Sequence, residues 1–63
     1  MKIPTYRLEL GSPLLPKRQY TTDKNGAICM ARYASGFYDE VRLEYGDYDG
    51  ETGDFDVIRK VAY

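Results

Sequence analysis

A single cysteine, Cys29, in a chain of 63 residues excludes the intrachain disulfides that hold many domains of this size together. The chain also lacks histidine, so it cannot assemble a structural zinc site from cysteine and histidine ligands. A domain this short buries only about 60% of the surface that its unfolded chain exposes, which leaves its stability marginal. The sequence therefore predicts a domain stabilised by a well-made core or by association with another chain, without a metal or a cofactor.

The composition is that of one globular domain. Hydrophobic residues make up 43% of the chain and aromatic residues 14%, so we expect residues 1–63 to form a single small domain. No apolar run follows Lys2, as a signal peptide would require, and the longest strictly apolar run, residues 27–31, is too short to span a membrane. These features predict a soluble, cytoplasmic protein in which Cys29 is a small buried apolar residue rather than a reactive thiol.

Two segments, residues 5–10 and residues 37–45, alternate between apolar and polar residues with the period of a β-strand. In the first segment, the predicted apolar face carries Tyr6, Leu8 and Leu10, and the predicted solvated face carries Thr5, Arg7 and Glu9. In the second segment, Arg42 and Glu44 alternate with Val41, Leu43 and Tyr45. Residues 17–21 could return as a short strand beside the first segment.

Residues 22–35 fit either a helix or a hairpin that turns at Asn25-Gly26. We favour the helix because apolar residues recur at the spacing i, i+3, i+4 and i+7, and because alanine disfavours strands. The residues of this stripe are Ala27, Met30, Ala31 and Ala34. Thr22 or Asp23 is the expected N-cap, and Gly36 stands where a left-handed C-terminal cap belongs.

The remaining segments complete the predicted topology. Residues 13–16, Pro-Leu-Leu-Pro, predict a stiff loop, and the glycine-rich residues 46–54 predict a turn or loop. Residues 55–63 read as a last strand whose apolar face is interrupted by Arg59, unless a bulge near Ile58-Arg59 restores the alternation. The prediction is a small ββαββ domain of the α+β class, with an antiparallel sheet and one helix packed on one face.

Charge is divided unevenly along the chain, although its net value is only −1. Residues 1–35 hold six basic and two acidic residues, a balance of +4, whereas residues 36–63 hold three basic and eight acidic residues, a balance of −5. This division indicates two electrostatically different faces or head-to-tail self-association, although solvated rims of a soluble domain give the same pattern.

The residues do not predict an enzyme. A nucleophile–base pair cannot use histidine, the serines are only Ser12 and Ser35, and no glycine-rich phosphate motif is present. The acidic stretch at residues 47–54 matches a calcium loop only in part, because its glycine precedes the third acidic residue and both the final bidentate glutamate and the helical flanks are missing. We interpret this stretch as a solvated hairpin loop.

Direct nucleic-acid binding is an alternative that the overall charge disfavours. Seven tyrosines could stack on bases, and four basic side chains could meet phosphates, namely Lys17, Arg18, Lys24 and Arg32. Nucleic-acid-binding domains are usually basic, however, whereas this chain has a pI near 5.2. Most of the tyrosines also fall on the apolar phase of predicted strands, where packing in the core explains them.

Protein binding accounts for more of the unusual features. Leu14 and Leu15, held between two prolines, form a stiff apolar tip that would lose little entropy on docking. The acidic hairpin could meet a basic groove on a partner that normally binds nucleic acid, through Asp47, Tyr48, Asp49 and Glu51. We therefore hypothesise a non-enzymatic binding module, an inhibitor that occludes a host protein or complex. A homodimeric accessory protein whose sheet edges pair is the alternative.

The order of these elements is similar to that of small phage-encoded inhibitors, such as phage inhibitors of bacterial RNA polymerase and some anti-CRISPR proteins. The likeness rests on the cap at Thr22-Asp23, the alanine-rich helix with Ala27-Ile28, Ala31 and Ala34, and the strand Val41-Arg42-Leu43. It implies a ββαββ fold and an inhibitory role. No motif of a site is shared, so the resemblance carries over no binding residue.

Overall fold

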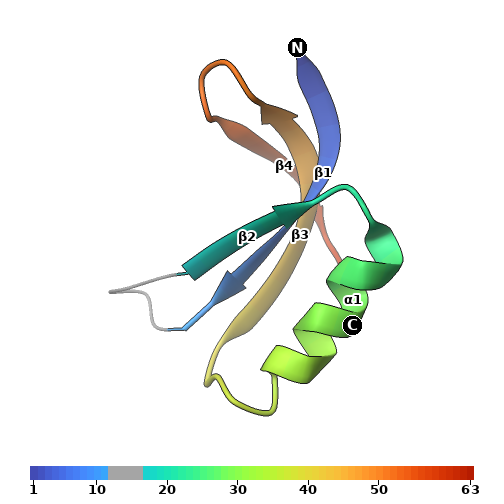
Figure 1. Cartoon of the computed structure of the whole chain (residues 1–63), viewed down its shortest axis with the longest axis vertical. Helices are drawn as coiled ribbons and strands as arrows, with labels where there is room; N and C mark the ends of the chain where they lie inside the picture. The colour runs from blue at the N-terminus through green and yellow to red at the C-terminus, as the bar shows by residue number, and fades with distance from the viewer. Residues whose placement is uncertain (12–16) are drawn as a thin grey trace.

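The computed structural model describes residues 1–11 and 17–63, which form one sheet and one helix (Figure 1). The elements are β1 (Lys2–Leu10), β2 (Lys17–Thr21), α1 (Lys24–Ala34), β3 (Val41–Asp49) and β4 (Phe55–Lys60). All neighbouring strands are antiparallel, in the order β2-β1-β3-β4. The predicted ββαββ, α+β fold is confirmed. Within the described part of the chain, no helix has the length and apolar character needed to cross a lipid bilayer.

The bounds of the two central strands differ from the prediction: β1 begins three residues before residue 5, and β3 is shifted by four residues from the predicted 37–45, so residues 37–40 do not belong to it. β1 and β3 each have nine residues and pair over their whole length, from Lys2 opposite Asp49 to Leu10 opposite Val41. The predicted loop at residues 46–54 therefore begins too early, because its first four residues continue β3 beside β1. These residues lack an aliphatic side chain, and backbone pairing with a long neighbour extends the strand instead. Residues 17–21, for which the sequence left strand and loop open, form β2.

The predicted bulge in the last strand is present. Tyr45 lies opposite Arg59 and Gly46 lies opposite Val57, so Ile58 is the extra residue on β4. The bulge brings β4 very close to Gly46, where a methyl group would overlap the Asp56 carbonyl and lie 2.8 Å from its carbon. It also places the Arg59 guanidinium 4.8 Å from the centre of the Tyr45 ring, so the residue that interrupts the apolar face contacts an aromatic ring.

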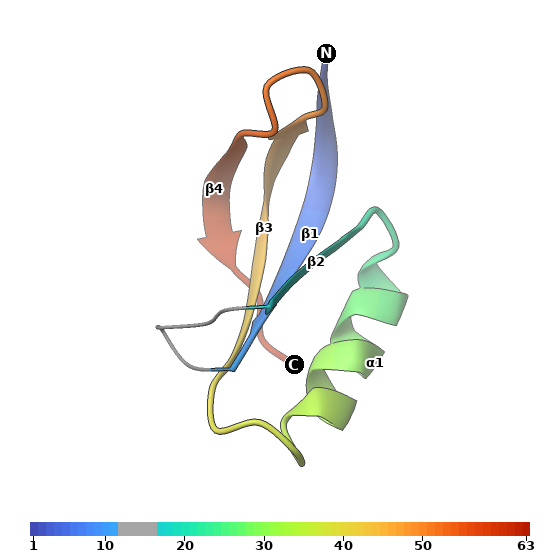
Figure 2. The ribbon, with the colours of Figure 1, turned by 60° about the vertical axis from the view of Figure 1, so that its left-hand side comes forward.

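The core lies between α1 and one face of the sheet (Figure 2). Its buried apolar residues are Tyr6, Leu8, Leu10, Ala27, Ala31, Ala34 and Leu43. Three alanines let the helix approach the strands closely, but they contribute little apolar area. Within the described residues, Leu8 is the largest side chain that is almost fully buried. The core is therefore thin, as expected for a chain of this length.

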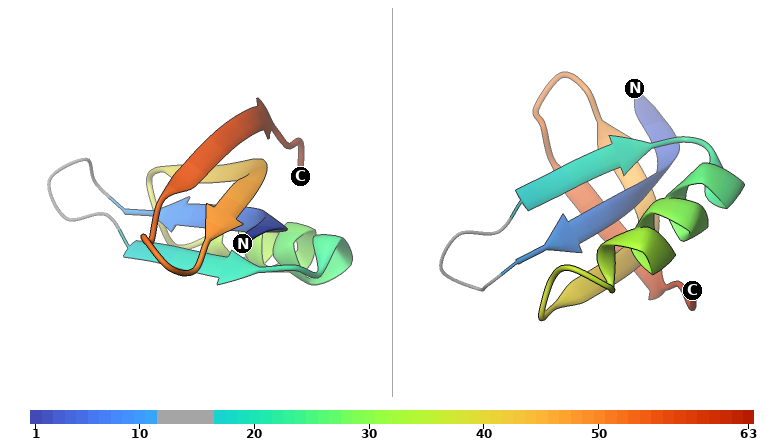
Figure 3. Two further views of the ribbon diagram at one scale, coloured as in Figure 1. Left: turned by 90° about the horizontal axis from the view of Figure 1, so that it is seen from above. Right: turned by 60° about the horizontal axis from the view of Figure 1, so that its bottom comes forward.

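The opposite face of the sheet is less solvated than the alternation predicted, because the sheet is strongly curled (Figure 3). The rings of Tyr20 on β2 and Phe55 on β4 lie 5.7 Å apart, although these strands form opposite edges of the sheet. The Arg7 guanidinium lies 4.6 Å from the Phe55 ring centre, and Thr5 is only 4% exposed. The expectation that Thr5 and Arg7 lie on a fully solvated face is wrong, since curling folds the aromatic residues over them.

The end of α1 differs from the prediction. Gly36 does not adopt a left-handed conformation, because residues with positive φ in the described ranges are limited to Gly11 and Gly53. The Ala34 carbonyl instead accepts hydrogen bonds from the backbone N–H groups of Phe37 and Tyr38, at 2.9 and 3.0 Å. These bonds hold both aromatic residues against the end of the helix. At the other end, Asp23 is the N-cap by position, without a capping hydrogen bond from its side chain.

Candidate functional site

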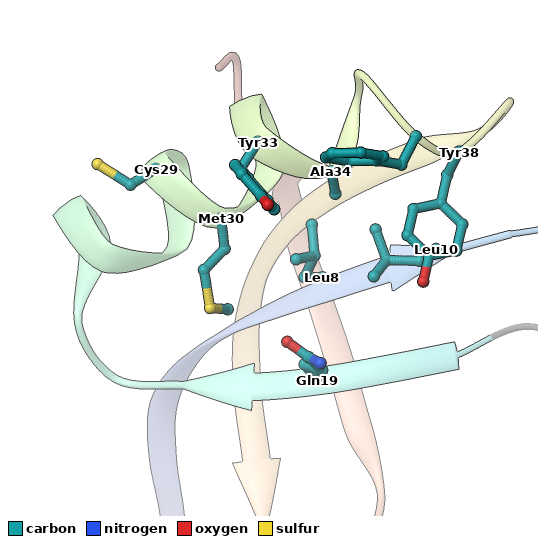
Figure 4. A pocket seen from close by; sticks show the side chains of 9 residues that line it. Leu8, Leu10, Gln19, Cys29, Met30, Tyr33, Ala34 and Tyr38 are labelled. Atoms are coloured by element: carbon teal, nitrogen blue, oxygen red, sulfur yellow. The ribbon is translucent and has the colours of Figure 1, made fainter.

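An open apolar groove runs between α1 and the edge of the sheet formed by β1 and β2 (Figure 4). It exists because α1 packs mainly on β1 and β3 and only lightly on β2. The groove has a volume of about 880 Å³. The residues that line it are Leu8, Leu10, Gln19, Cys29, Met30, Tyr33, Ala34, Phe37 and Tyr38. We call this feature the α1–β2 groove.

The helix wall of the groove comes from an apolar stripe that is wider than the sheet can cover. At 3.6 residues per turn, Met30 and Tyr33 lie about 60° and 120° around the helix from Ala27, on the side toward β2. The sheet buries the alanine part of the stripe and leaves the larger residues beside it open. Tyr33 is 74% exposed and Phe37 is 70% exposed, with ring centres 5.0 Å apart. This exposed aromatic pair forms the outer rim of the groove.

Cys29 lies at the same rim and is exposed. The prediction that it is a small buried residue is therefore wrong. Its position is one residue before Met30, on the solvent side of the apolar stripe, so the helix turns its thiol outward. Since the chain has no other cysteine, a thiol-reactive probe would attach at this one position beside the groove.

The floor of the groove ends at β2, which is an edge strand with β1 as its neighbour. Four of its five residues are exposed, and Gln19 points into the groove from its centre (Figure 4). An edge strand presents unpaired backbone N–H and C=O groups on its outer side. The groove therefore combines apolar side chains with a backbone edge that can accept a further strand.

The predicted acidic site is only partly brought together. Asp47 and Asp49 lie on the helix-side face of β3, beyond the end of α1, and Asp56 lies directly opposite Asp47 on β4. Tyr48 points to the other face, where its ring centre is 5.0 Å from that of Tyr20, so it does not join the carboxylates. Glu51 lies in the turn, and its backbone N–H donates to the Asp49 side chain at 2.9 Å.

The amino-terminal end of the chain partly neutralises this acidic end. The Lys2 ammonium lies 3.0 Å from the Asp56 carboxylate, and the terminal amine of Met1 lies 3.9 Å from Asp49 and 3.8 Å from Glu51. The hydrogen bond and the charge of Asp56 raise the pKa of Lys2 above its ordinary value. Within residues 1–11 and 17–63, no three side chains of the metal-binding types are grouped to hold an ion.

Leu14 and Leu15, the other half of the predicted protein-binding site, lie outside the described residues. The basic residues of the nucleic-acid alternative do not form one patch. Lys17 and Arg18 are neighbours on β2 and point to opposite faces of the sheet, and Arg18 bonds Glu9 at 3.0 Å. Lys24 begins α1, whereas Arg32 lies in its last turn.

The groove was not among the predicted sites, although the sequence contained part of its signal. The helical stripe included Met30, and Tyr33 and Phe37 continue it at i+3 and i+7 along the side that faces β2. What the sequence did not provide was the lateral position of the helix over β1 and β3. That position decides which part of the stripe stays exposed.

Comparisons with models of known protein families, with curated proteins and with solved structures found no match.

Proposed function

We propose that this chain is a protein-binding module that acts by surface contact through the α1–β2 groove. The observation that carries the proposal is the exposed pair Tyr33 and Phe37 at the rim of a concave apolar surface. Aromatic residues are favoured at the energetic centres of interfaces, and contiguous apolar patches on small proteins often mark binding sites. The adjacent edge of β2 supplies backbone groups that a protein partner can pair with.

Catalysis is not part of the proposal, because the groove lacks the groups it would need. Its lining, as far as the structure describes it, offers an amide, phenols, a thiol and apolar side chains, without a carboxylate or an imidazole. An exposed free thiol at the rim fits a reducing compartment, which supports a cytoplasmic location within the same proposal.

Met30→Asp is expected to abolish the association. Met30 is 37% exposed and points into the groove, so a carboxylate there would be desolvated by a docked protein while the isolated fold tolerates it. A tagged chain is co-expressed with an untagged copy, and stoichiometrically retained proteins are identified by mass spectrometry. Asn25→Asp, on the exposed first turn of α1, makes the same change in charge and should retain them. Equal retention by both variants would contradict the proposal.

The inhibitor hypothesis remains a second candidate, and it uses the acidic end of the sheet. The observation that favours it is the group of carboxylates at that end, where Asp47 lies directly opposite Asp56 and Lys2 neutralises only part of the negative charge. A host protein that handles nucleic acid would offer such a cationic surface.

Replacing Asp47, Asp49 and Glu51 with lysine is expected to release a partner bound at the acidic end. The difference in binding between the wild type and this variant should become smaller as the salt concentration rises. The matched control carries Met30→Asp, which should leave this interaction intact. If the triple variant retains the same proteins as the wild type, the acidic end is not a binding surface.

A further inference from the structure

We infer that the occupant of the α1–β2 groove is a second copy of this chain, which pairs antiparallel with β2 across a two-fold axis. The inference rests on the proposed function and names the partner for the same groove. A two-fold axis normal to the sheet would join the two sheets edge to edge and keep both α1 helices on one face. The two grooves would then face each other across the axis, so that the groove side of each helix is turned toward that of the second copy.

Geometry and charge select one register for this pairing. In an antiparallel pair of strands, directly opposite residues lie on the same face of the sheet. A two-fold axis normal to the sheet must therefore pass between one residue of β2 and the same residue of the second copy. If the axis passed between the two copies of Arg18, two like charges would lie opposite each other. Centring on Gln19 avoids this and overlaps all five residues of β2, with Lys17 opposite Thr21 and Arg18 opposite Tyr20 of the second copy. In this register Arg18, which bonds Glu9 at 3.0 Å, lies opposite the uncharged Tyr20 of the second copy.

The exposed area places the interface at the lower limit of size for specific association. An aromatic side chain buries about 150–250 Å² when it is fully covered, so Tyr33 and Phe37 of both copies can supply roughly 500 Å². A stable interface needs about 1,200 Å² in total. The remaining roughly 700 Å² must come from β2, Met30 and Tyr38 of each copy, or about 50 Å² per residue. This exceeds the roughly 30–40 Å² per residue of ordinary interfaces, so these exposed residues must be covered more fully than interface residues usually are.

The thin core gives an independent reason for self-association. The helix buries three alanines, while Met30 and Tyr33 on its groove side, and Phe37 just after its end, stay exposed. The one cysteine cannot form an intrachain disulfide. A second copy would move these large side chains out of water and compensate for the limited interior of a short domain.

The test joins the two copies at the predicted axis. In a Cys29→Ser background, Gln19→Cys should form an intermolecular disulfide under mild oxidation, since residues opposite each other have Cα atoms about 4.5–5.5 Å apart. Arg18→Cys is the matched control, because its own copy lies two residues out of register, about 8 Å away and beyond disulfide reach. We expect the Gln19 variant to give at least about tenfold more covalent dimer on non-reducing gels.

Sedimentation equilibrium of the purified wild type completes the test. The predicted result is a mass that rises with concentration toward twice the 7.3 kDa of the chain. A monomer at all concentrations, or equal cross-linking of the two cysteine variants, would overturn the inference. If the wild type is monomeric and Met30→Asp releases a different protein from the tagged chain, the groove proposal stands with another occupant. If Met30→Asp releases nothing, the proposed function fails as well.

Discussion

Replacing Gly46 with alanine is expected to destabilise the fold by more than about 3 kcal/mol, enough to unfold much of a marginally stable domain. The added methyl group would overlap the backbone carbonyl of Asp56 and lie 3.1 Å from the Phe55 ring. The carbonyl cannot rotate away as an exposed side chain could, because it belongs to the backbone of β4 beside the bulge at Ile58. Relief therefore requires β4 to separate from β3.

Gly50→Ala is the matched control for Gly46→Ala. Gly50 lies in the turn after β3, and a Cβ atom there meets no atom within 4 Å. We expect Gly50→Ala to change the free energy of unfolding of the domain by less than about 0.5 kcal/mol. Urea unfolding followed by circular dichroism measures both variants. If Gly46→Ala unfolds at the same urea concentration as Gly50→Ala, the close approach of β4 to β3 is wrong.

Arg7→Met is expected to cost about 2–3 kcal/mol, because it leaves the Glu44 carboxylate without its partner under the curled sheet. The Arg7 Nη2 atom donates to Glu44 Oε1 at 2.8 Å, and the two side chains are 14% and 12% exposed. This residual exposure places the expected cost below that of a fully buried pair. The double variant Arg7→Met with Glu44→Leu should recover most of the loss, since it leaves no unpaired charge.

The pH dependence of this pair follows from Arg7. Burial lowers the pKa of its guanidinium, but hydrogen bonds and attraction to Glu44 and Tyr20 outweigh burial and raise the pKa above its ordinary value. A raised pKa for a basic group gives stability that persists below its unfolded value and disappears only at higher pH. The charge of Arg7 therefore contributes at every physiological pH.

Arg18→Met is the matched control for the Arg7 variant, because the side chain of Arg18 is 50% exposed and its partner Glu9 keeps a second ion pair, with Arg42 at 3.2 Å. We expect it to cost less than about 1 kcal/mol. Thermal unfolding at pH 7 compares the two single variants and the double variant. Equal losses for Arg7→Met and Arg18→Met would contradict the burial of the Arg7–Glu44 pair.

Much of the fold could be predicted from local patterns. The alternation around Leu8 and Leu43 identified strands whose apolar faces meet the helix, and the spacing of the alanines identified α1. The bulge could be predicted because Arg59 breaks an otherwise regular alternation. These features follow from periodicity along a single element, which the sequence records directly.

The candidate site depended on information that a single element does not contain. Met30 and Tyr33 become groove residues only because α1 sits over β1 and β3 rather than over β2. Tyr48 is separated from Asp47 and Asp49 because β3 continues through residues that looked like a loop, and a strand alternates its side chains. Thr5 is buried by the curl of the whole sheet. All three outcomes depend on tertiary packing, which overrides local preference.

The methyl groups of the two methionines offer the most direct test of whether a protein covers the α1–β2 groove. Met30 lies in the groove, while Met1 is 85% exposed at the chain end and serves as an internal reference. In methyl-labelled protein, we predict that a soluble paramagnetic agent, held at a fixed concentration, relaxes both methyl groups when the protein is dilute. When the protein is concentrated, the agent should relax the methyl group of Met1 alone, because the second copy shields Met30. Equal relaxation of both methyl groups from dilute to concentrated solution would contradict the account.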